Sequence, residues 1–197
     1  MMSRRKHEAE STRDRALREA KDLLQHVGFN GFSFQHVAER LGINKASLYS
    51  HFESKEELGE ALVADYHRQF SMWCDAVAGL YPDQKIMAFY DLFYLFSKDD
   101  FKVCPLSALT IELAGLPLRV RKAAIDMSTF QMNWITSVIS EGKRGGVFQT
   151  KISTADLSRS LLSLGLGAQL TARLTKNADA VKNVRALALE LLQVKSH

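Results

Sequence analysis

The chain of 197 residues contains only two cysteines, three prolines and 11 glycines. Cys74 and Cys104 are too few for the disulfide framework of a small secreted protein, and their spacing matches no zinc-binding pattern. The shortage of proline and glycine excludes collagen-like and proline-rich architectures. The N-terminus lacks the apolar run of a secretory signal, and no apolar stretch approaches the roughly 20 residues that a membrane-spanning helix needs. We therefore expect a soluble cytoplasmic protein without a membrane partner.

The residues that are present describe an ordinary folded protein of one domain or two small ones. Apolar residues make up 46% of the chain and charged residues 24%, which excludes a wholly disordered chain. Lys and Arg outnumber Asp and Glu by 26 to 22, for a net charge of +4. Most of this excess lies in residues 1–52, where Arg4, Arg5 and Lys6 form a cluster. Such a cluster is by itself more often a solvated tail than a nucleic-acid site.

Apolar residues recur at helical spacing along nearly the whole chain and predict an all-α protein of about nine helices. We expect Thr12 to cap the first helix, Gly28 and Gly42 to end the first two helices, and Gly142, Gly145 and Gly146 to end the helix at 117–141. The predicted helices span about 12–27, 34–41, 45–51, 54–78, 82–96, 105–114, 117–141, 155–175 and 179–194. A change of composition near residue 75 predicts a helix-turn-helix domain over 10–56, a connecting helix to about 78 and a larger helical domain over 79–197.

The segment from Ser33 to Lys55 has the pattern of a helix-turn-helix motif. Ala38 is small enough for a second helix to cross close by, and Gly42 permits the left-handed backbone of a sharp turn. Asn44 can cap the following helix, whose apolar positions Leu48 and Phe52 face inward. In such a motif the second helix enters the major groove of DNA.

The remaining positions of this second helix are turned wholly or partly outward. None of them is acidic and most can donate hydrogen bonds, which suits phosphate oxygens and base edges. These positions are Lys45, Ala46, Ser47, Tyr49, Ser50 and His51. A plain helical corner with polar solvent contacts would show the same pattern.

The string Leu48-Tyr49-Ser50-His51-Phe52-Glu53-Ser54-Lys55-Glu56-Glu57-Leu58 resembles a mark of the TetR family of transcriptional repressors, and the resemblance covers residues 12–70. It implies a homodimer that binds a palindromic double-stranded DNA operator and releases it when a small molecule binds. Position 50 is often aromatic in that family and is serine here, which weakens base reading by this residue. The implied DNA-contacting residues are Ser33, Gln35, Asn44, Lys45, Ala46, Ser47, Tyr49, Ser50, His51 and Lys55.

Two further sites follow from the same resemblance, and in both cases ordinary core packing explains the same residues. The effector would lie among large apolar groups between the helices at 83–97, 105–114 and 118–141, and we expect no metal and no other cofactor. The pocket residues would be Phe89, Phe93, Phe96, Cys104, Met127, Phe130, Gln131 and Trp134. The last two helices would pair with a second subunit through Leu157, Leu161, Leu164, Ala168, Val184, Leu187 and Leu191.

Cys104 offers an alternative way of sensing. It precedes Pro105 at the start of a predicted helix, where the helix dipole lowers the pKa of a thiol, and some members of the family sense electrophiles or oxidants through a cysteine at a similar place. A small buried thiol that packs as a hydrophobe is the other interpretation. An enzyme is not expected, because the chain has no His-Glu-x-x-His, phosphate loop or nucleophile elbow. A helical adaptor without DNA binding is the remaining alternative class.

Overall fold

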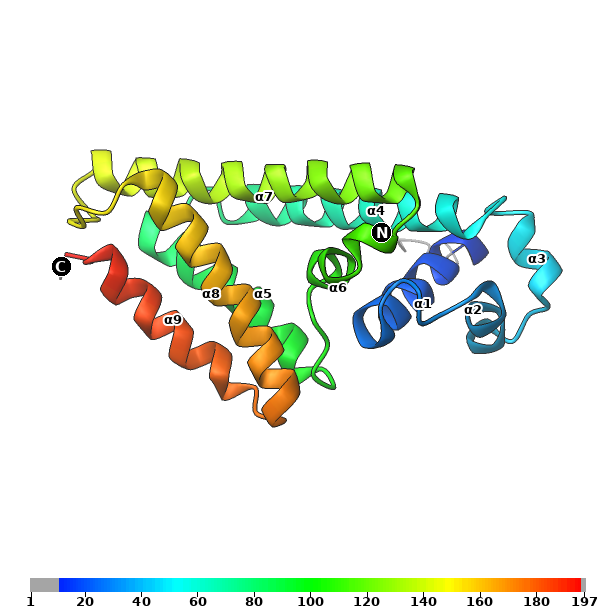
Figure 1. The fold of residues 1–197 in the computed structure, drawn as a ribbon. Coiled ribbons are helices and arrows are strands. Elements are labelled where there is room, and N and C mark those ends of the chain that lie inside the picture. The colour runs from blue at the N-terminus through cyan, green and yellow to red at the C-terminus, as the bar shows by residue number, and fades with distance from the viewer. Residues whose placement is uncertain (1–10, 196–197) are drawn as a thin grey trace, which may run out of the picture.

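The computed structural model describes residues 11–195, in which nine α-helices and one short 3-10 helix form an all-α fold, as predicted (Figure 1). The basic cluster Arg4–Lys6 and the first residue of the predicted N-terminal domain lie outside the described residues, as do residues 196 and 197. The helices are α1 Thr12–Val27, α2 Phe34–Leu41, α3 Lys45–Tyr49, α4 Lys55–Ala76, α5 Pro82–Lys98, α6 Pro105–Ile111, α7 Leu118–Arg144, α8 Thr154–Thr175 and α9 Asp179–Leu192, and the 3-10 helix spans Leu113–Gly115.

The helices fall into a small group and a large group that share α4. Helices α1, α2 and α3 pack together at one end of the molecule, and α5, α8 and α9 pack together at the other (Figure 1). Helices α4 and α7 run side by side and join the two ends. The short helix α6 contacts α1, α4 and α7. It is therefore the element placed between the helix-turn-helix and the larger helical body.

Most helix starts and stops lie where the capping residues predict them. The side chains of Asn44, Ser54 and Ser153 each accept a hydrogen bond from a backbone N–H in the first turn of α3, α4 and α8. Gly28 and Gly42 follow α1 and α2 with positive φ angles of 79° and 67°. These residues fix the lengths of the helices in the N-terminal group.

The predicted cap of α1 is wrong, and the predicted end of α7 is right only in part. The cap of α1 is Ser11 and not Thr12, because the Ser11 side chain accepts the hydrogen bond from the Asp14 N–H. Of the three glycines predicted to end α7, Gly145 is the residue that follows its last position, Arg144, whereas Gly142 lies inside the helix. A Cβ atom at Gly142 would lie 2.2 Å from the Phe148 ring, so this glycine makes room for an aromatic side chain and does not stop the helix.

Two absences hold for the described part of the chain. None of its helices is both long and apolar enough to cross a membrane. No three His, Cys, Asp or Glu side chains among residues 11–195 are grouped so that they could hold a metal ion.

Candidate nucleic-acid interface

The turn between α2 and α3 has the geometry of a helix-turn-helix corner. Gly42 adopts a left-handed conformation, and its N–H donates to the carbonyls of Ala38 and Glu39. The Ile43 N–H donates to the Ala38 carbonyl over 3.1 Å, which closes the end of α2. Ala38, whose small side chain was predicted to lie where the two helices cross, is completely buried. The corner therefore fixes the direction in which α3 leaves α2.

Helix α3 is anchored from its inner side. Asn44 Oδ1 accepts hydrogen bonds from the Ser47 N–H at 2.8 Å and the Ser47 hydroxyl at 3.0 Å. Leu48 and Phe52 are each only 1% exposed, and the Phe52 N–H donates to the Leu48 carbonyl. A helix of five residues is not stable alone, so these buried side chains and the cap hold it in place.

The outward side of this corner collects most of the residues predicted to contact DNA. Tyr49 is 51% exposed, and its ring packs 5.1 Å from the Phe34 ring while the Lys45 ammonium lies 6.0 Å from it. The Ser50 hydroxyl donates to the Ser47 carbonyl. The exposed residues are Gln35, Asn44, Lys45, Ala46, Tyr49 and Ser50, and the half-buried ones are Ser33, Ser47 and His51. This surface offers hydroxyl, amide and ammonium donors and no carboxylate from α3.

Lys55, which was also predicted to contact DNA, lies over two aromatic rings. Its ammonium lies 4.6 Å from the Phe29 ring and 4.9 Å from the Phe32 ring, in the turn between α1 and α2. Burial lowers the pKa of Lys55, and the carboxylate of Glu112 opposes that shift. The charge therefore stabilises the packing of α4 on the α1–α2 turn by a cation–π contact.

Arg13 is a candidate that the sequence reasoning missed. It lies in the first turn of α1, is exposed, and its guanidinium carbon is 5.0 Å from the centre of the Phe52 ring, directly after α3. A basic residue in the first turn of an amphipathic helix is ordinarily a solvated surface residue, so only the fold shows its position beside α3.

Four of the five aromatic residues predicted to line an effector pocket, Phe89, Phe93, Phe130 and Trp134, belong to one aromatic cluster of α4, α5 and α7, whereas Phe96 lines a separate hollow beside α1. Phe70, which was not predicted, lies 6.2 Å from Phe89, 5.9 Å from Phe130 and 6.0 Å from Trp134. Phe93 covers Gly165, where a Cβ atom would lie 2.4 Å from its ring. Phe89, Phe93, Cys104, Met127 and Gln131 are buried, and Phe96, Phe130 and Trp134 are half-buried. In this conformation these side chains form a packed core.

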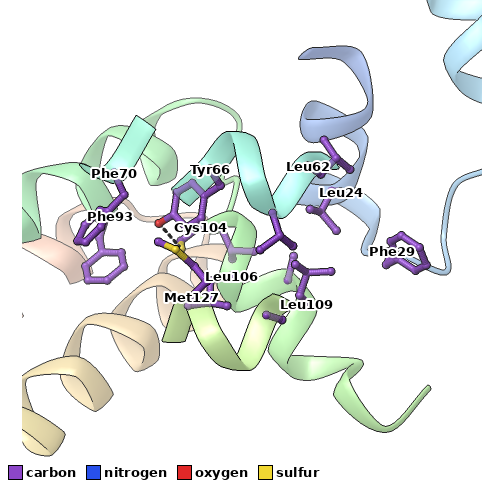
Figure 2. Packing of buried hydrophobic residues seen from close by; sticks show 14 of the residues in the cluster. Leu24, Phe29, Leu62, Tyr66, Phe70, Phe93, Cys104, Leu106, Leu109 and Met127 are labelled. Atoms are coloured by element: carbon purple, nitrogen blue, oxygen red, sulfur yellow. Dashed lines mark hydrogen bonds between the residues drawn. The ribbon is translucent and has the colours of Figure 1, made fainter. Parts of the chain in front are cut away.

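A chain of uncharged polar groups crosses this core. The Tyr66 hydroxyl lies 3.1 Å from the Cys104 sulfur and accepts a hydrogen bond from Gln131 Nε2 at 3.0 Å. Gln169 Oε1 accepts from the Cys104 N–H and from the Ser107 hydroxyl, both at 3.2 Å. Figure 2 shows Tyr66 and Cys104 pointing toward each other among buried apolar side chains. The network ties α4, α6, α7 and α8 together at one point.

The environment of Cys104 contradicts the expected lowering of its pKa. The residue does stand directly before α6, but it is 1% exposed. Burial raises the pKa of the Cys104 thiol, and the hydrogen bonds from Tyr66 and the first turn of α6 only oppose that shift. The rise in the pKa of Cys104 that follows from removing the thiol from water exceeds the fall that the dipole of a seven-residue helix causes.

We therefore expect both thiols of the folded protein to react slowly. Burial also raises the pKa of the half-buried Cys74, to about 12. Because the thiolate is the reactive form, iodoacetamide should modify the native protein at pH 7.5 at least ~10-fold more slowly than the urea-unfolded protein. Mass spectrometry of each cysteine-containing peptide measures this rate. Native Cys104 modification as fast as in the unfolded chain would show that the thiol is accessible and activated.

The predicted dimer residues divide into two sets. Leu157, Leu161 and Ala168 are buried inside the single chain, so their inclusion was wrong: they form the core side of α8. Leu164, Val184 and Leu191 are half-buried, and Leu187 is 42% exposed. Ser160, Ser163, Leu164, Leu187 and Leu191 line a shallow hollow between α8 and α9. Leu170 and Leu174, which were not predicted, extend the exposed apolar surface along α8.

Comparison with known protein families gives a match to each part of the chain. The family model described as "Bacterial regulatory proteins, tetR family" matches residues 16–62. The model described as "Tetracyclin repressor-like, C-terminal domain" matches residues 82–188, more than half of the chain.

Individual proteins are similar over nearly the full length. The HTH-type transcriptional regulator UidR of Escherichia coli K12 is 25% identical over 195 residues, which cover 95% of this chain and 96% of UidR. The HTH-type transcriptional repressor NemR of the same strain is 24% identical over 92% of this chain and 94% of NemR. A crystal structure of a TetR transcriptional regulator from Legionella pneumophila superposes with a TM-score of 0.86 at 25% identity, covering 95% of this chain and all of that one.

Proposed function

Because the chain belongs to the TetR family of bacterial regulatory proteins and is a transcriptional regulator with a helix-turn-helix DNA-binding domain, we propose that it is a homodimeric repressor. It binds a palindromic operator through α3 and is released when a small, mainly apolar molecule binds the larger helical body. The observation that carries the proposal is the anchoring of α3 through Leu48 and Phe52, which leaves a face of hydrogen-bond donors exposed.

The proposed contacts divide by their chemistry. Lys45 and His51, together with the hydroxyl of Ser33, donate to phosphate oxygens, while Ala46, Ser47 and Tyr49 face base edges. We add Arg13 to the phosphate-contacting set because its guanidinium lies beside Phe52, and Lys55 stays a proposed phosphate contact, with its ammonium over the rings of the α1–α2 turn. Gln35, Asn44 and Ser50 lie at the edge of this surface.

The proposed division of the chain assigns a task to each part. Residues up to 56 form the DNA-binding domain, α4 connects it to the body, and residues from 79 onward bind the effector and the second subunit. One α3 helix covers few base pairs, so a two-fold dimer that reads two spaced half-sites supplies the specificity. The dimer surface consists of Leu164, Leu187 and Leu191 with Leu170 and Leu174, all on α8 and α9.

Release depends on α6, which is held at both ends. At its start, Cys104 and Ser107 are hydrogen-bonded to Gln169 of α8. Just after its end, Glu112 Oε2 accepts a hydrogen bond from the Asn30 N–H, in the turn between α1 and α2, at 3.0 Å. An effector that binds more tightly to a conformation with a shifted α6 therefore also moves the DNA-binding domain. The free energy of this shift equals the difference between the effector's binding free energies for the two positions of α6.

The buried state of Cys104 gives no support to sensing by this thiol. The effector is then bound without a covalent bond, in the core where Tyr66, Gln131 and Gln169 provide the polar groups. Such a combination of many apolar and few polar groups is typical of small-molecule sites.

Fluorescence anisotropy with a labelled duplex from the region upstream of the protein's own coding sequence tests the proposal. If the dimer neutralises about eight phosphates, the affinity should fall by ~10³–10⁵-fold between 50 and 200 mM salt. A scrambled duplex of equal length measures non-specific binding. Failure to bind the upstream duplex at any salt concentration, by a protein shown to be folded, would contradict the proposed function.

A further inference from the structure

The loop between α5 and α6 has a strained backbone. Asp100 and Phe101 are consecutive residues other than glycine with positive φ angles of 51° and 53°. This left-handed region is unfavourable for residues with a Cβ atom, and the conformation persists only where the surroundings hold it. We refer to residues 99–103 as the hinge loop.

The C-terminal end of α1 holds one side of the hinge loop. Asp22 pairs with the Lys102 ammonium at 2.7 Å, and His26 Nε2 lies 3.1 Å from Asp100 Oδ2. The buried Gln25 side chain donates to the Val103 carbonyl at 2.9 Å. These contacts join the DNA-binding domain to the loop that leads into α6.

The C-terminal end of α8 holds the same loop from the other side. Arg173 Nε donates to the Phe101 carbonyl at 3.0 Å, and the Lys176 ammonium lies 4.9 Å from the Phe101 ring. A second nitrogen of the same Arg173 guanidinium donates to the Gln25 carbonyl of α1. Figure 1 shows the loop that leads to α6 beside this end of α8.

The partners of Arg173 are unusual for a cation. The ion pairs found in residues 11–195 do not include it, and both of its acceptors are backbone carbonyls from two different segments. The Gln25 carbonyl is one of the last four of α1, which have no partner within the helix and carry its negative dipole end. The planar guanidinium can bind both carbonyls at once, which a lysine ammonium at the end of a flexible stem does less well.

We propose that Arg173 is a positioning residue for DNA binding: it connects α8 directly to α1 and holds the helix-turn-helix at a fixed orientation on the body. The inference rests on the proposed function, because the same helix carries the exposed Leu170 and Leu174 of the proposed dimer surface. Through this contact, the position of α8 in the dimer determines the distance between the two α3 helices. This connection runs beside α6 and does not pass through it.

Replacing Arg173 tests the proposal through operator affinity. We expect Arg173→Ala to weaken operator binding ~10-fold or more, within the ~5–150-fold range of ordinary coupling between sites. The operator affinity of Arg173→Lys should lie between that of Arg173→Ala and that of the original protein. The dependence of affinity on salt should keep its slope, because no phosphate contact is lost. Arg159→Ala is the matched control, since Arg159 is an exposed arginine on the same helix, paired only with Asp156.

Hydrogen exchange gives a readout that needs no DNA. In both Arg173 variants, amides in residues 22–31 and 98–104 should exchange at least ~10-fold faster, because the local opening free energy falls. In the Arg173 variants, the amides of α9 should exchange at the same rate as in the original protein. In Arg159→Ala, all exchange rates should match those of the original protein. Unchanged exchange, or unchanged or tighter operator binding by Arg173→Ala, would overturn the role of Arg173. If the original protein itself does not bind the operator, that result would instead contradict the proposed function.

Discussion

Replacing Leu187 with glutamate is expected to convert the protein from a dimer to a monomer and to abolish tight operator binding. Leu187 is 42% exposed and lines the hollow between α8 and α9 together with Leu164 and Leu191. In the proposed dimer this hollow is covered by the second copy, so a carboxylate there would be buried without a partner. Breaking an interface in this way costs about 3–5 kcal/mol, which weakens dimerisation by more than ~100-fold.

Light scattering after size-exclusion chromatography measures the mass of the variant, and anisotropy measures its affinity for the operator. The matched control is Leu118→Glu, because Leu118 is an exposed leucine at the start of α7, away from the proposed surface. The monomer should retain its helical content and unfold at a temperature set by its own core. A Leu187→Glu variant that remains a dimer would place the interface elsewhere.

The second large effect is expected from Tyr49→Ala, which should weaken operator binding by about 10–100-fold, equivalent to ~1–3 kcal/mol. Tyr49 is 51% exposed, and its ring packs on Phe34. Since half of the side chain is exposed, its loss should cost the folded state only about 0.5–1.5 kcal/mol of aromatic contact. The effect on binding should therefore exceed the effect on stability.

Tyr49→Phe separates the two contributions of this side chain. The ring remains on Phe34, so thermal unfolding should match the original protein, while loss of the hydroxyl should weaken binding in part. Differential scanning calorimetry measures the unfolding temperature, and anisotropy at a single salt concentration measures the operator affinity. If Tyr49→Ala unfolds far earlier and binds the operator unchanged, Tyr49 belongs to the core of the corner and not to the interface.

The helix-turn-helix could be predicted because its determinants are local. Gly42 requires a left-handed backbone, Asn44 caps the next helix, and Leu48 and Phe52 lie at helical spacing. Each of these residues acts within ten positions of its partner, so one stretch of sequence contains both. Ser54 and Ser153 could likewise be predicted at the starts of α4 and α8, because a capping residue contacts only the first turn of its own helix.

The errors arise where a residue's partner is remote. The apolar stripes of α8 and α9 look alike in the sequence, and only the fold shows that Leu157 and Leu161 face the core while Leu187 faces outward. The pKa of Cys104 depends on burial by α4, α7 and α8, which outweighs its position before a helix. Arg173 and its acceptor at Gln25 are 148 positions apart, so no local pattern could have joined them.

In the proposed complex, α3 lies in the major groove of the operator and is held there by its buried inner side. Dimethyl sulfate methylates guanine N7 in the major groove and adenine N3 in the minor groove, so methylation of the bound upstream duplex shows which groove α3 occupies. We predict two symmetric sets of protected guanine N7 atoms about one helical turn apart, both weakened with Tyr49→Ala at the same protein concentration. Protection confined to adenine N3, or a complex that protects no guanine N7, would contradict the account.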